Sequence, residues 1–82
     1  MVRLEAVFAC GDGMTPDVAA KLTAIAERYD AKLEMERGGK RVLLDSLIGI
    51  LSVPCGKGDR LTILAEGDDA QAAAEAIRDA LA

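Results

Sequence analysis

The chain has 82 residues, ten of them Lys or Arg and fourteen Asp or Glu, which gives a net charge of −4. With one Phe, one Tyr and no Trp, it has neither the basic patch nor the aromatic platform with which proteins bind nucleic acid. It also contains no His, so Ser-His-Asp and Cys-His catalytic arrangements are impossible and we expect no enzymatic activity. No membrane-length apolar stretch and no signal peptide is visible, so we expect a single cytoplasmic domain spanning residues 1–82.

The first third of the chain predicts a strand followed by a helix. Apolar residues occupy alternate positions from 2 to 8, which is typical of a strand with one buried face. Gly11-Asp12-Gly13 ends this strand. Thr15 then stands at an N-cap position, and Pro16 follows at the first helical position. The apolar stripe of the helix continues in steps of four, three and four residues: Val18, Leu22, Ile25 and Tyr29.

The middle of the chain predicts a hairpin and a short helix. Leu33 and Met35 alternate with charged residues in a second strand. Gly38-Gly39 predicts a tight turn, after which residues 40–44 return as a third strand. Asp45-Ser46 can cap a short helix over residues 47–52.

The last third predicts a loop, a strand and a helix. Pro54 and the run from Gly56 to Asp59 form the loop, and apolar residues at 61, 63 and 65 then alternate as a fourth strand. Gly67-Asp68-Asp69 opens the final helix. Its buried stripe is expected to comprise Ala70, Ala73, Ala74, Ile77 and Leu81.

The order of these elements predicts the fold class. Each strand offers one apolar face and each long helix one apolar stripe, and all of these surfaces must be buried together. The simplest arrangement is an α+β, open-faced two-layer sandwich in βαββαβα order. In it, helices cover one face of a four-stranded antiparallel sheet.

Several segments together carry a family resemblance. They are Gly39-Lys40, residues 46–52 (SLIGILS), Gly56-Lys57-Gly58, and Glu66-Gly67-Asp68-Asp69 followed by an Ala-rich helix. In this order and at this spacing the chain resembles the HPr family, the small phosphocarriers of the bacterial sugar phosphotransferase system. The resemblance implies the same sandwich fold and a non-enzymatic role with protein partners and no cofactor.

The segment matching the family's active site departs from its pattern. The family reads Gly-Leu-His-x-Arg-Pro, whereas this chain reads Gly13-Met14-Thr15-Pro16-Asp17-Val18. The resemblance thus places Thr15 where the family has its phosphorylated histidine, and Asp17 where an arginine would hold the phosphoryl group. Imidazole carries phosphate in a labile N–P bond, whereas threonine forms a stable ester and Asp17 repels the anion. We therefore expect no histidine phosphocarrier activity and interpret Thr15 as an N-cap.

Ser46 matches a regulatory position of the family. In Gram-positive members a serine here is phosphorylated by a dedicated kinase, and the product is a corepressor partner in carbon catabolite regulation. A phosphoserine at an N-cap places its charge beside unpaired N–H groups, although Asp45 would repel it. Two interpretations stay open: Ser46 is a phosphorylation site, or it only caps the short helix.

Leu47, Ile48 and Leu51 are expected to form a partner-docking surface, since the resemblance implies that this helix is exposed. Adjacent residues on a helix cannot both point inward, so at least one of Leu47 and Ile48 should face out. The alternative is that these residues complete the core. The partners implied by the resemblance are an HPr kinase, a transcriptional regulator or a phosphotransferase-system component, with no direct nucleic-acid or membrane contact.

A different class of protein also contains Asp45-Ser46-Leu47. Acyl carrier proteins attach phosphopantetheine to the serine of this motif, and they too are small and acidic. They are all-helical, however, whereas strand patterns flank the motif here. The hypothesis of an HPr-like regulatory or binding protein is therefore favoured over an acyl-carrier-like protein.

The two cysteines, Cys10 and Cys55, are too few for a disulfide framework, and a zinc site needs about four ligands. We interpret them as small, half-buried apolar residues and expect no metal. In an HPr-like fold both would lie near the mouth of the former active centre, so a redox pair is the alternative.

Overall fold

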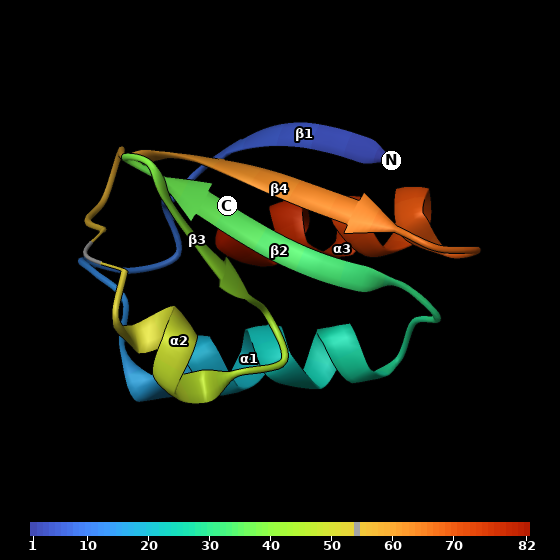
Figure 1. The fold of residues 1–82 in the computed structure, drawn as a ribbon. Helices are drawn as coiled ribbons and strands as arrows, with labels where there is room; N and C mark the ends of the chain where they lie inside the picture. The colour runs from blue at the N-terminus through green and yellow to red at the C-terminus, as the bar shows by residue number, and fades with distance from the viewer. Residues whose placement is uncertain (54) are drawn as a thin grey trace.

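The computed structural model describes residues 1–53 and 55–82; Pro54, expected in the loop before the fourth strand, lies outside the described residues. The elements follow the predicted order (Figure 1). They are β1 (Val2–Val7), α1 (Pro16–Glu27), β2 (Lys32–Arg37), β3 (Lys40–Leu43), α2 (Leu47–Leu51), β4 (Arg60–Glu66) and α3 (Ala70–Leu81). Predicted and observed ends differ by one or two residues. Within the described parts of the chain, every helix is too short or too polar to cross a lipid bilayer.

The four strands form one sheet in the order β1-β4-β2-β3, and every neighbouring pair is antiparallel. The last strand in the sequence is thus central and pairs along both edges. Leu61 lies opposite Ala6 on β1, and Ile63 lies opposite Met35 on β2. This register directs the apolar alternation of three strands to the same face, as predicted.

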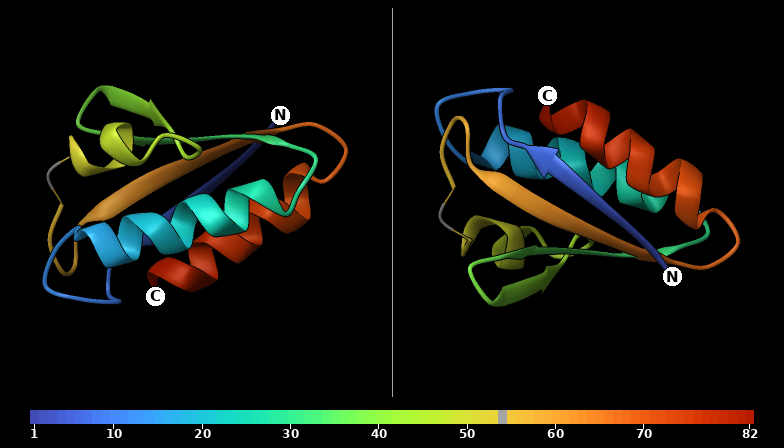
Figure 2. Two further views of the ribbon diagram at one scale, coloured as in Figure 1. Left: turned by 90° about the horizontal axis from the view of Figure 1, so that it is seen from below. Right: turned by 90° about the horizontal axis from the view of Figure 1, so that it is seen from above.

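The helices cover one face of this sheet. In Figure 2 the helices α1 and α3 lie in front of the strands when seen from below and behind them when seen from above. Helix α3 packs against β1 and β4, and α1 lies between α3 and α2. The predicted α+β two-layer sandwich with an open face is therefore confirmed.

The core lies between the two layers. The stripe predicted for α3 is fully buried, and Ala80 extends it. On α1, Ala19 and Leu22 are buried, whereas Val18 and Ile25 are only partly so, because α1 packs mainly against the other helices. Tyr29, the last residue of the expected stripe, lies just beyond the end of α1 and is also partly buried. The largest fully buried side chains are Phe8, Leu22, Met35, Leu44, Ile50, Leu61, Ile63, Ile77, Leu81 and Val53.

Leu64 is buried on the open face, where the alternation of β4 predicts exposure. It is 3% exposed, although it points away from the helices. Arg3 on β1 and Glu34 on β2 lie directly opposite it. Long charged side chains cover neighbouring apolar surface with their aliphatic stems, so the central strand is shielded on both faces.

Two glycine turns require backbone conformations that other residues rarely adopt. Gly38 and Gly39 have φ angles of 59° and 82°, as the predicted hairpin turn requires. Gly67 has a φ of 131°, and a Cβ there would lie 2.7 Å from the carbonyl oxygen of Asp30. The N–H of Asp30 donates to the Asp69 carboxylate at 2.8 Å, and the N–H of Asp69 donates back to the Asp30 carbonyl at 3.2 Å. Asp69 thus joins two loops instead of capping α3 with its side chain.

The small residues on the buried side of α3 set how closely this helix approaches its neighbours. Ala73 is completely buried, whereas Ala72 on the same helix is exposed. We expect Ala73→Leu to overpack the core and lower the free energy of unfolding by about 1–3 kcal/mol. The matched control Ala72→Leu should change it by less than about 0.5 kcal/mol. Urea denaturation measures both, and equal effects would contradict this packing.

Candidate functional site

Two loops meet at one end of the sheet and position the start of α1. Gly13, in the loop after β1, forms an isolated antiparallel bridge with Gly56, in the loop before β4. The N–H of Met14 donates to the carbonyl oxygen of Cys55 at 3.3 Å. Because the second loop follows α2 directly, these contacts hold Thr15 beside the segment that leads out of α2.

Thr15 is the N-cap of α1, as predicted. Its backbone is extended, and its Oγ1 accepts a hydrogen bond from the N–H of Val18 at 3.3 Å. Pro16 takes the first helical position, and the exposed Asp17 lies in the first turn, where a negative charge interacts favourably with the helix dipole. The segment therefore satisfies every local requirement of a helix start. A cap of this kind contributes about 1 kcal/mol.

Ser46 is the N-cap of α2, which the sequence also predicts. Its Oγ accepts a hydrogen bond from the N–H of Gly49 at 3.1 Å. A Cβ on Gly49 would lie 3.1 Å from that same oxygen, so the glycine leaves room for the cap. Asp45 precedes it as an exposed residue. The capping role of Ser46 is thus confirmed, and its regulation stays a prediction.

Helix α2 has one anchored side and one exposed side. Ile50 and Val53 are 0% and 1% exposed and fix the helix to the core. On the other side Leu47, Ile48 and Leu51 are 41%, 83% and 39% exposed. We call these three residues the α2 patch. They do not complete the core, and a cluster of exposed apolar side chains on one short helix is typical of a contact surface.

The loop before β4 is held by an ion pair that the sequence did not reveal. The carboxylate of Asp59 accepts a hydrogen bond from the N–H of Gly56 at 2.7 Å and contacts the Arg37 guanidinium at 2.9 Å. The hydrogen bond from the Gly56 N–H lowers the pKa of the Asp59 carboxyl below its usual 3.8, and the nearby charge of Arg37 lowers it further by a smaller amount. An Asp at the end of a Gly-rich turn was the only available signal, because Arg37 comes from a distant hairpin.

Cys10 and Cys55 are free and half-buried, and both pack against the edge of the core. Burial raises the pKa of the Cys55 thiol above 9.0, and Asp59 and Cys10 add to this effect, while Arg37 and the Met14 N–H oppose it. The burial agrees with their interpretation as small apolar residues. Redox pairing stays a hypothesis. Among residues 1–53 and 55–82, no three metal-ligating side chains come together.

A family profile described as "PTS HPr component phosphorylation site" matches residues 3–82. The chain belongs to the HPr family. It is 35% identical over 79 residues to phosphocarrier protein NPr of Shewanella violacea, covering 94% of this chain and 87% of the relative. It is 31% identical over 77 residues to the HPr-like protein Crh of Halalkalibacterium halodurans, and the match covers 94% of this chain and 92% of that relative. The crystal structure of a phosphocarrier protein HPr from Bacillus anthracis superposes with a TM-score of 0.93 at 32% identity. This superposition covers 99% of this chain and 96% of the HPr chain.

Membership of the HPr family confirms the resemblance and the fold that it implied. The relatives NPr and HPr are phosphocarrier proteins and not enzymes. The four-stranded sheet is incompatible with an all-helical acyl carrier protein, so the Asp45-Ser46-Leu47 motif has no such meaning here. The profile is named for a phosphorylation site, yet this member contains no histidine.

The Asp59 contacts predict a pH-dependent contribution to stability. Because the folded pKa is lowered, the ionised carboxylate stabilises the fold above the unfolded value of about 3.8, and this stabilisation is lost as the pH falls through the lower folded value. Asp59→Asn should therefore be less stable than wild type at pH 7, and the difference should shrink below pH 3.8. Thermal unfolding across this range measures it. The exposed Asp68→Asn is the control, and a difference that persists at low pH would contradict the assignment.

Proposed function

We propose that this HPr family member acts in the cytoplasm as a regulatory or binding protein without histidine phosphocarrier activity. It docks protein partners through the α2 patch: an HPr kinase, a transcriptional regulator or a phosphotransferase-system component. One observation carries the proposal. The chain retains an anchored, exposed apolar helix beside the family's phosphorylation segment, but it has no imidazole with which to carry phosphate.

The loss of carrier chemistry follows from the groups present at the start of α1. A carrier must accept a phosphoryl group and release it to the next protein, which requires a bond as labile as the N–P bond of phosphohistidine. Thr15 Oγ1 could form only an ester, and this oxygen already accepts the Val18 N–H. Asp17 places an anion in the same turn. The segment is therefore better suited to starting a helix than to relaying phosphate.

The α2 patch supports docking through its apolar area and its rigidity. Complete burial of an Ile or Leu side chain contributes roughly 1.5–3 kcal/mol, and Ile48 is 83% exposed. Ile50 and the Ser46 cap hold the helix in place before any partner arrives. Such preorganisation lowers the entropic cost of binding.

Phosphorylation of Ser46 is the proposed means of regulation. Ser46 directly precedes Leu47, so a phosphate there would lie at the border of the α2 patch and change what can dock on it. Its oxygens could accept from the first N–H groups of α2, while the neighbouring Asp45 would oppose the added charge. The relatives include both a phosphocarrier, NPr, and an HPr-like protein, Crh, so membership of the family alone does not choose between carriage and regulation.

Incubation with an HPr kinase and ATP tests this regulation. We expect intact mass spectrometry to show the addition of one phosphate to the wild type and none to Ser46→Ala. The chain offers a matched control, because Ser52 is its only other serine and ends the same short helix. Ser52→Ala should be phosphorylated like the wild type. An unmodified wild-type protein, or phosphate retained by Ser46→Ala, would rule the regulation out.

The carrier reaction is tested with the phosphotransferase enzyme that normally charges HPr. We expect no acid-labile phosphoryl group on the wild type, whereas a histidine-containing HPr in the same assay should be charged. Thr15→His combined with Asp17→Arg restores the family's residue types and should gain labile phosphate. Labile phosphate on the wild type would overturn the proposed loss of activity.

A further inference from the structure

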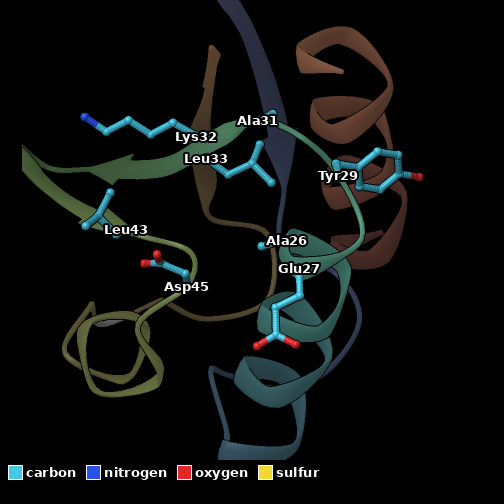
Figure 3. Close-up of a pocket in the computed structure, with 8 residues that line it drawn as sticks. All are labelled: Ala26, Glu27, Tyr29, Ala31, Lys32, Leu33, Leu43 and Asp45. Carbon is cyan, nitrogen blue, oxygen red and sulfur yellow. The ribbon is translucent and has the colours of Figure 1, made fainter. Parts of the chain in front are cut away.

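A cavity of about 240 Å³ opens between the C-terminal end of α1 and the turn that joins β3 to α2 (Figure 3). Its floor is apolar and includes Ala26 and Leu33. Leu33 is buried, whereas Leu43 is 42% exposed at the rim. Ligand pockets commonly measure roughly 300–1,000 Å³, so this cavity suits a single long side chain better than a cofactor.

The rim of the cavity carries two carboxylates. Glu27 from α1 and Asp45 from the β3–α2 turn lie on opposite sides of the opening (Figure 3). Neither side-chain carboxylate forms an ion pair or a hydrogen bond with any residue in the described part of the chain. Lys32 also lines the cavity, but its ammonium group points away from both carboxylates, as does the hydroxyl of Tyr29. The opening is therefore locally negative.

The apolar floor and the negatively charged rim together determine which kind of side chain can bind in the cavity. A purely apolar group would fill the floor but would desolvate the two carboxylates without pairing them, which is unfavourable. An anion would be repelled by the same charges. Arginine and lysine side chains have the required form, because an aliphatic stem can lie on the apolar floor while the cationic end remains at the charged rim.

We propose that this cavity receives an arginine or lysine side chain of the protein that docks on the α2 patch. This inference rests on the proposed function and narrows the class of partner. Asp45 is followed directly by Ser46 and Leu47, so the cavity and the α2 patch lie on either side of one short turn. The partner surface accordingly combines an apolar anchor with a neighbouring basic residue.

The cavity is tested with a small probe, n-butylguanidinium, which has the stem and charge of an arginine side chain. In an NMR titration of the ¹⁵N-labelled full chain, we expect amide shifts concentrated in residues 26–33 and 43–45. 1-Butanol, which has the same alkyl chain and no charge, and butanesulfonate, which is anionic, should produce no comparable shifts. Shifts of similar size with either control, or none with the guanidinium, would overturn the proposal.

Variants identify the carboxylates responsible. Glu27→Gln and Asp45→Asn should each weaken binding of the probe about two- to five-fold, as expected for exposed charge pairs. Glu5→Gln is the matched control, since Glu5 is exposed on β1, two strands away from β2. Unchanged affinity in both cavity variants would overturn the assignment. The probe binds without a partner, so the titration tests the cavity alone. Docking on the α2 patch is tested separately with Ile48→Ser, which should weaken binding of a partner protein and leave binding of the probe unchanged.

Discussion

The pairing of β4 along both edges is the constraint on which the rest of the structure depends. It is the only strand in the described sheet that contacts both β1, from the start of the chain, and β2, from its middle. Its inward residues form the centre of the core, and Leu64 is covered on the outer face. At its ends, Asp59 fixes the loop beside Thr15, and the loop after Glu66 is fastened to Asp30. The position of the site is thus a consequence of sheet pairing.

The same packing explains why a five-residue helix can serve as a binding surface. An isolated helix of this length would not be stable in water. Here Ile50 is inserted into the core and the Ser46 cap satisfies the N–H of Gly49. These two contacts use one side of α2 and its first turn, which leaves much of the α2 patch exposed, above all Ile48 at 83%. Apolar surface that stays exposed on a fixed helix needs another explanation, and contact with a partner provides one.

The sequence predicted features that depend on neighbouring residues and missed those that depend on distant ones. The alternation at 61, 63 and 65, the α3 stripe and both caps are local, because each follows from the period of one element or from a few consecutive residues. Leu64 is buried only because of the strands that flank it. Arg37 and Asp59 form an ion pair, and Glu27 and Asp45 face each other across the cavity, although each pair comes from segments that are far apart in the sequence. Periodicity contains no information about such pairs, so the loop contacts and the cavity required the structure.

The charges near the two helix starts have opposite consequences for the two possible activities. Asp17 follows Thr15 and Asp45 precedes Ser46, so each cap has a carboxylate beside it. At physiological ionic strength the Debye length is about 8 Å, so these charges act on groups bound next to them. Asp17 opposes a phosphoryl group on Thr15, whereas Asp45, at the rim of the cavity, favours a basic side chain there. A phosphate on Ser46 would add roughly −1.5 to −2 charge beside Asp45. Under the proposed function, that modification would strengthen the attraction for a basic partner, so that phosphorylation and the acidic rim select the same class of protein.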